Sequence, residues 1–157
     1  MRLHIAIDVQ NHQAEIDLSA GVIALLHAAA QDAWSELEHV KLSENSVDEL
    51  DALDIAMVDR VESDRVHREF MDIAGATDVI TFHHGELLIC PDIARSQAVE
   101  YGEPVLRELL RYLVHGMLHL AGYHDAETDD RSCMEAVQER MVASLWVGHF
   151  GREFECK

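Results

Sequence analysis

Two histidines four residues apart give the strongest chemical signal in the sequence. His115 and His119 lie in an apolar run from Val105 to Ala121, and a helix over that run places both imidazoles on one face, one turn apart. Imidazole nitrogen is a common ligand of zinc and other divalent metals, so the pair can chelate a metal ion. Two ordinary core histidines are the competing interpretation of this spacing.

The residues after the pair favour the metal interpretation. Gly122 follows His119 by three positions, and a glycine there can end the helix in a left-handed conformation and turn the chain back. The turn delivers His124 or Asp125 toward the open side of the pair. In metzincins the third ligand lies three residues beyond the glycine, which is Asp125 here. We therefore predict a metal site of His115, His119 and Asp125, with His124 as the competing third ligand.

The residue after the first histidine argues against one reaction. Zinc peptidases of the His-Glu-x-x-His type use that glutamate as the general base, and this chain has Gly116 there. Two imidazoles and a carboxylate leave coordination positions open, which is typical of a catalytic site. Such a site can acidify water and polarise a carbonyl or phosphoryl oxygen. Iron oxygenases use the same ligand types, but nothing else in the sequence indicates oxidative chemistry.

Composition limits the class of protein. With 157 residues, 48% of them hydrophobic, residues 1–157 are expected to form a single domain with its own core. The net charge of −18, from 30 acids and 12 bases, argues against broad affinity for nucleic acid, so any such contact must be local. The three cysteines form neither a disulfide framework nor a cysteine-only zinc site. Without a signal peptide or membrane span, a cytoplasmic protein is expected.

Hydrophobic patterning predicts how strands and helices alternate around the site. Strands are expected at 2–9, 53–58, 77–82 and 86–90, the last two forming a hairpin. Helices are expected at 19–37, 59–71, 91–101 and 103–122, with a last one opening near residue 127. Residues 38–51 are predicted to be mainly loop and the tail from 148 loose. On the helix at 59–71, we expect Val61, Val66 and Phe70 to point inward.

Two motifs in this pattern resemble those of a known family. The residues His115, Gly116, Leu118, His119, Leu120, Gly122 and Tyr123 match the pattern His-Gly-x-Leu-His-Leu-x-Gly-Tyr-Asp-His. Segments 77–82 and 85–90, Thr-Asp-Val-Ile-Thr-Phe and Gly-Glu-Leu-Leu-Ile-Cys, are similar to Thr-Asp-Val-Leu-Ser-Phe and Gly-Asp-Ile-x-Ile-x. These patterns belong to the YbeY family of metal-dependent endoribonucleases. The resemblance runs from about residue 53 to residue 134, and the first 50 residues agree only in expected topology.

The resemblance implies a function and a fold. The function is that of a single-strand-specific, metal-dependent endoribonuclease acting in 16S rRNA maturation and ribosome quality control, with one zinc ion per chain. The implied partners are single-stranded RNA, rRNA and the ribosome or ribosomal proteins, with no membrane partner. Together with the patterning, it predicts an α+β fold: a small mixed four-stranded sheet with about five helices packed around it and a central, zincin-like metal helix.

The chain departs from the family pattern at two positions. The pattern ends Asp-His, whereas this sequence has His124-Asp125. A carboxylate ligand leaves bound water less acidic and can admit manganese or iron beside zinc, while a free His124 could shuttle protons. The family arginine that precedes the Thr-Asp-Val strand by six residues is Met71 here. Arg68, about one turn earlier, is the nearest substitute for contacting RNA phosphate, with a plain surface arginine as the alternative.

Other interpretations stay open. A different metal-dependent hydrolase, including an atypical peptidase, is weakened by Gly116. A ribosome assembly factor with a structural metal fits the acidic charge, because such a factor can bind basic ribosomal proteins. His83 and His84, between the paired strands, are interpreted as surface residues. The arginines of the helix at 59–71 are interpreted as a solvated basic face.

Overall fold

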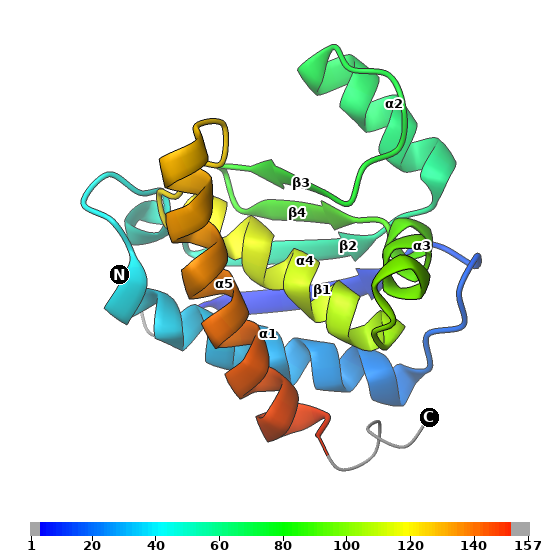
Figure 1. Ribbon diagram of the computed structural model, residues 1–157, viewed down its shortest axis with the longest axis horizontal. Helices are drawn as coiled ribbons and strands as arrows, with labels where there is room; N and C mark the ends of the chain where they lie inside the picture. The colour runs from blue at the N-terminus through cyan, green and yellow to red at the C-terminus, as the bar shows by residue number, and fades with distance from the viewer. Residues whose placement is uncertain (1–3, 152–157) are drawn as a thin grey trace.

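A four-stranded mixed sheet organises the fold in the computed structural model, which describes residues 4–151. The strand order is β1-β2-β4-β3; β1 pairs parallel with β2 and β2 parallel with β4, while β3 and β4 are antiparallel. The strands are β1 (Ala6–Asn11), β2 (Ala52–Met57), β3 (Val79–Phe82) and β4 (Glu86–Ile89). β3 therefore forms one edge of the sheet (Figure 1).

Five α-helices and one short 3-10 helix complete the described chain. They are α1 (Ala20–Val40), the 3-10 helix (Val47–Glu49), α2 (Arg60–Met71), α3 (Pro91–Tyr101), α4 (Val105–Leu120) and α5 (Thr128–His149). Ser19 caps α1, because its hydroxyl accepts a hydrogen bond from the amide of Val22 at 3.2 Å. Asp59 caps α2 in the same way through the amide of Glu62 at 2.8 Å. The predicted α+β class with a mixed four-stranded sheet is confirmed.

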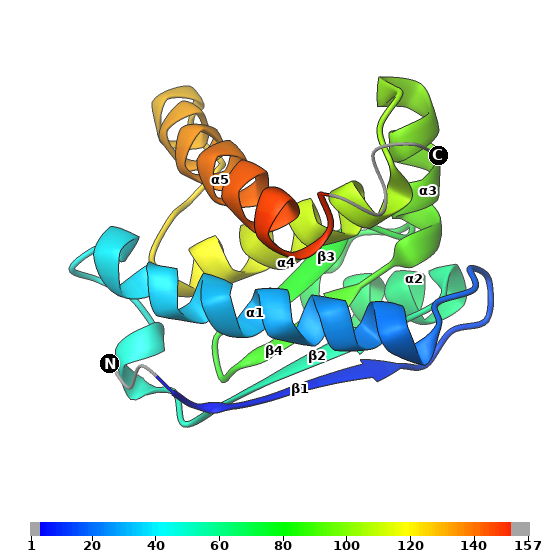
Figure 2. The ribbon, with the colours of Figure 1, turned by 90° about the horizontal axis from the view of Figure 1, so that it is seen from below.

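The main core lies between one face of the sheet and the helices. Figure 2 shows α1 and α4 on the same side of the sheet, with α5 farther out across α4. The alternation of the strands produces this asymmetry, because Ile55, Leu87 and Ile89 point into the core while Asp54 faces solvent. Leu113 and Leu118 of α4 are completely buried against them. The predicted metal helix, α4, is therefore packed against both the sheet and the other helices.

The buried apolar face of α2 is narrower than the sequence predicts. Val66 is buried, but Val61 and Phe70 are 78% and 59% exposed, so the expectation that both point inward is wrong. The buried apolar side chain of α2, Val66, packs in a small second cluster with Ile80 and Leu88. Phe70 makes an edge-on contact with Phe82, with ring centroids 5.3 Å apart, from the rim of that cluster. A pattern of apolar spacing alone does not reveal how much surface the partner offers.

Several predicted element boundaries shift. The first strand begins at Ala6, and residues 1–3 lie outside the described part of the chain. The segment at 38–51 contains the end of α1 and the 3-10 helix, so it is less irregular than expected. α5 continues to His149, past the point where a loose tail was predicted. Among residues 4–151, no helix has both the length and the hydrophobicity needed to cross a bilayer.

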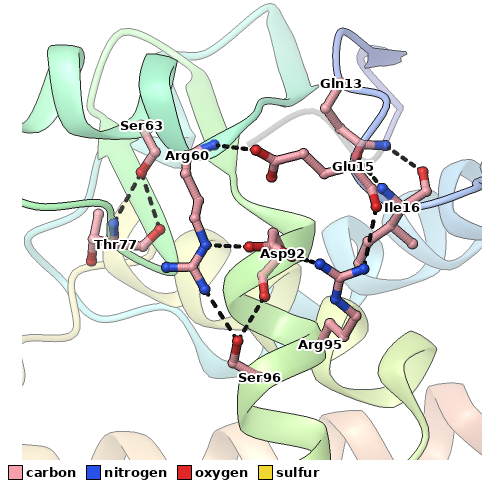
Figure 3. A network of polar contacts seen from close by, with 9 residues as sticks. All are labelled: Gln13, Glu15, Ile16, Arg60, Ser63, Thr77, Asp92, Arg95 and Ser96. Carbon is pink, nitrogen blue, oxygen red and sulfur yellow. Dashed lines mark hydrogen bonds and ion pairs between the residues drawn. The ribbon is translucent and has the colours of Figure 1, made fainter.

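A polar network fixes the N-terminal end of α2 against α3 (Figure 3). Asp92, in the first turn of α3, is buried and accepts hydrogen bonds from both Arg60 and Arg95. Arg60 also donates to the hydroxyl of Ser96 at 3.1 Å, and Arg95 donates to the carbonyl oxygen of Glu15 at 3.3 Å. Arg60, foremost, lowers the pKa of Asp92, so the carboxylate is charged at neutral pH. The network positions α2 beside β3.

Candidate metal centre

α4 approaches the sheet closely where it carries the two histidines. Gly116, between His115 and His119, is the reason. A Cβ atom at this position would lie 2.9 Å from Cδ2 of Leu87 and 3.3 Å from the Thr81 hydroxyl, inside van der Waals contact. The absence of a side chain at Gly116 therefore allows α4 to lie close to the sheet. Zinc peptidases of the His-Glu-x-x-His type carry their general base at this same sequence position.

The turn after α4 is built to return the chain to the histidines. Gly122 has φ +102°, a left-handed conformation, and a Cβ atom there would lie 2.1 Å from the carbonyl oxygen of Glu44. The amide of Tyr123 donates to the carbonyl of Leu118 at 3.0 Å, and its hydroxyl donates to the carbonyl of Val40 at 2.7 Å. Asp125, two residues farther, is thereby brought beside the pair.

Three candidate ligand atoms converge. The Nε2 atoms of His115 and His119 are 3.0 Å apart, and Oδ2 of Asp125 lies 3.4 Å and 3.7 Å from them. Ligands about 2.05 Å from a tetrahedral zinc ion are about 3.3 Å apart. The three atoms thus form a triangle of the size that one face of a zinc tetrahedron requires. Among residues 4–151, these three side chains form the group of His, Cys, Asp or Glu residues whose ligand atoms lie close enough together to share one metal ion.

The other ring nitrogens explain why a cation fits. Nδ1 of His115 is 2.7 Å from Oε1 of Gln138, and Nδ1 of His119 is 3.0 Å from the carbonyl oxygen of Tyr123. Both partners accept, so both Nδ1 atoms carry hydrogen, and in the neutral rings both Nε2 atoms present lone pairs to each other. Burial first, and then His115, lower the pKa of His119, which keeps that ring neutral and able to bind metal.

The comparisons with known proteins agree with this geometry. The family model described as Endoribonuclease YbeY matches residues 8–146. The chain belongs to the YbeY family. A YbeY protein of Elusimicrobium minutum, named Endoribonuclease YbeY, is 34% identical over 105 residues, which cover 59% of this chain and 73% of that protein. One of Kineococcus radiotolerans with the same name is 34% identical over 135 residues, covering 75% and 78%.

A solved structure has the same fold as this chain. The solution structure of TM1509 from Thermotoga maritima superimposes with a TM-score of 0.62 at 23% identity and covers 94% of this chain and 93% of its own. At that identity the likeness concerns the fold alone. The family resemblance seen in the sequence is therefore confirmed by the family model, and the fold independently by this structure.

The candidate ligands open onto a cleft along the edge strand. The cleft has a volume of about 590 Å³. Its lining comes from α2 and the loop after it, from β3, and from the ligand residues: His67, Met71, Ile73, Thr77, Asp78, Val79, Ile80, Thr81, His83, His115, His119 and Asp125. This YbeY family chain thus places its three candidate ligands in the wall of a cleft that also borders α2 and β3.

The structure separates the other predicted site residues from the ligands. His124 is exposed beside Asp125 and does not join the ligand cluster. Arg68 lies on α2 and pairs with Asp64 at 2.8 Å, and it is not among the cleft-lining residues. His83, interpreted as a surface residue, is exposed and also lines the cleft. The roles of Arg68 and His124 stay predictions.

Two residues of the site were missed at the sequence level. Gln138 is 7% exposed and comes from α5, 23 residues after the histidine that it orients. His67 comes from α2, one turn before Met71, and lines the cleft. Gln138 could have been noticed in the sequence because it is a polar residue at a position of α5 that faces inward, between Met134 and Met141.

We expect Gln138→Leu to lower metal affinity about 10- to 100-fold, because partners of ligating histidines fix ring orientation and basicity. The change removes the acceptor for Nδ1 of His115 and keeps a side chain of similar size. Competition with a chromogenic chelator measures the affinity. Glu135→Leu, at an exposed position of α5 one turn earlier, is the control. Equal affinity of the Gln138 variant and wild type would contradict an orienting role.

Proposed function

We propose that the chain cleaves phosphodiester bonds in single-stranded RNA with a metal ion held by His115, His119 and Asp125, and that it acts in 16S rRNA maturation and ribosome quality control. The observation that carries the proposal is the convergence of two imidazoles and a carboxylate on an open cleft, with distances of 3.0–3.7 Å. The names of its YbeY relatives supply the reaction class.

Zinc is the proposed ion, because two imidazoles and one carboxylate form a known catalytic zinc set, and manganese or iron remain compatible with the carboxylate. When bound, the ion would polarise a phosphoryl oxygen and lower the pKa of bound water. His115 and His119 would supply imidazole nitrogens as ligands, oriented by Gln138 and Tyr123. Asp125 supplies the negative ligand, and exposed His124 is proposed to move protons between the cleft and solvent.

The assignment of the third ligand gives a direct test. Asp125→Ala is expected to lower the zinc content of the purified protein from about one per chain to a small fraction, because a carboxylate ligand is lost and no other described side chain completes the triangle. His124→Ala is the matched control on the neighbouring residue and should keep its zinc. Elemental analysis after dialysis measures both. Normal zinc in Asp125→Ala with loss in His124→Ala would make His124 the ligand.

The reaction itself is tested with three substrates. The zinc-loaded protein should cleave a single-stranded RNA, should cleave the same sequence much more slowly as a duplex, and should leave an unstructured peptide intact. Cleavage of the peptide instead would support the hydrolase alternative that Gly116 disfavours. A protein that keeps its zinc and cleaves none of the three substrates would support the assembly factor with a structural metal.

The cellular setting is part of the proposal. We infer that residues 1–157 act as one cytoplasmic domain and that the chain meets its RNA on ribosomal particles, where its charge of −18 suits basic ribosomal proteins. Co-sedimentation with small ribosomal subunits at low and high salt tests the association. Arg68 is retained as a candidate phosphate contact, to be compared with its neighbour below.

A further inference from the structure

The cleft lacks a permanent positive charge. Among its lining residues there is no lysine or arginine, and Asp78 and Asp125 add negative charge. An RNA backbone nevertheless gains most of its affinity from cations placed near phosphates. Apart from the candidate metal ligands, the lining contains two histidines, His67 and His83, and histidine is a side-chain type that can carry a positive charge.

His67 is held in a fixed orientation. Its Nδ1 is 2.8 Å from the carbonyl oxygen of Gly75, so Nδ1 carries hydrogen and donates. Gly75 is in turn fixed, because its amide donates to Oδ1 of Asp64 at 2.6 Å and its φ of +103° suits glycine. Nε2 of His67 has no hydrogen-bonding partner among residues 4–151. One nitrogen therefore anchors the ring and the other is left for a ligand.

The neighbouring cations are placed differently. Arg68 follows His67 in sequence but has its guanidinium paired with Asp64, outside the cleft lining. His83 is more exposed, and its Nδ1 lies 2.7 Å from the hydroxyl of Ser46, a group that can donate or accept. Of the two histidines, His67 therefore has the ring whose orientation is better fixed by hydrogen bonds.

We propose that His67 binds a phosphate of the RNA chain through Nε2, an inference that rests on the proposed function and names a substrate contact of the same cleft. Exposed Met71 and Ile73, also in the cleft wall, provide apolar surface for a base beside that phosphate. The contact depends on a positive charge on the imidazole, and imidazoles in general are protonated more fully as the pH falls, so RNA affinity is expected to increase with falling pH. Other titratable groups around the cleft and the ring are Asp64, Asp78, His83, His115, His119 and Asp125.

The experiment separates His67 from those groups by substitution. Binding of a fluorescently labelled 12-nucleotide single-stranded RNA to zinc-loaded protein is measured by anisotropy at 4 °C, at pH 6 and pH 8 and over a range of salt concentrations. Gel electrophoresis after each titration confirms that the RNA is intact. At pH 6, His67→Ala should bind about five- to tenfold more weakly, and its salt slope should fall by about 0.7, the value for one contact to a single strand.

His67→Arg gives the sharper result. A permanent guanidinium should restore affinity at pH 6 and retain it at pH 8, where the wild type binds more weakly. Arg65→Ala is the matched control, because Arg65 is on the same helix and pairs with Glu62 and Glu69 away from the cleft. It should bind within twofold of wild type. Circular dichroism shows whether each variant folds.

Three outcomes would overturn the inference: His67→Ala binding as tightly as wild type at pH 6, His67→Arg binding no better than His67→Ala, or Arg68→Ala showing the loss in place of His67→Ala. Failure of the proposed function is recognised separately. A protein that binds the RNA through His67 and does not cleave it would refute the nuclease and leave the phosphate contact supported.

Discussion

His119→Ala is expected to lose its metal and to cleave single-stranded RNA at least about 10³-fold more slowly than the wild type. The imidazole is one of three groups whose atoms lie within 4.8 Å of one another, and its removal leaves two ligands. A catalytic metal contributes several kcal/mol to the transition state, and about 4 kcal/mol corresponds to a factor of 10³. Elemental analysis and single-turnover cleavage rates measure the two losses on the same preparation.

His12→Ala controls for the loss of an imidazole elsewhere. His12 is exposed and directly follows β1. It lies near Asp8, Gln10 and Asp54, on the face of the sheet opposite to α4. It should keep both metal and activity. Wild-type rates in a folded His119→Ala protein without metal would refute the catalytic site. Full metal occupancy in that protein would refute the ligand assignment.

Gly122→Ala is expected to have the largest effect on stability, lowering the free energy of unfolding by about 2–5 kcal/mol. A left-handed conformation costs a non-glycine residue about 1–2 kcal/mol, and the added Cβ would lie 2.1 Å from the carbonyl oxygen of Glu44, so backbone must also move. The movement displaces the turn that presents Asp125, and metal content should fall with stability. Urea unfolding measures the free energy.

Gly102→Ala is the matched control for the conformational part of this cost. Gly102 ends α3 with φ +65°, and a Cβ atom there would have no neighbour within 4 Å. Its substitution should cost only about 1–2 kcal/mol and should leave metal binding unchanged. Equal costs for the two substitutions would show that the close approach to Glu44 has no effect of its own.

The parts of the site that could be predicted from sequence are those that local geometry determines. His115 and His119 are one helical turn apart, and Gly122 turns the chain back within the next few residues, so spacing predicted the pair together with either His124 or Asp125. Gln138 and His67 reach the site from α5 and α2. Their positions depend on how those helices pack, which periodicity does not encode.

The same distinction applies to the fold. Strands and helices followed from alternation and capping residues such as Ser19 and Asp59. The inward assignment of Val61 and Phe70 was wrong because the apolar surface opposite α2 is the small cluster around Ile80 and Leu88. Amphipathic spacing identifies the face that packs, and the width of the buried stripe depends on the size of the opposing surface.

The most direct test is a zinc titration of chelator-treated wild-type protein, with bound metal and the rate of cleavage of one single-stranded RNA followed in the same samples. Cleavage should be absent from metal-free protein, increase in proportion to bound zinc and reach its maximum at about one ion per chain. Cleavage at the full rate by metal-free protein, with its folded state verified by circular dichroism, would contradict metal-dependent hydrolysis at His115, His119 and Asp125.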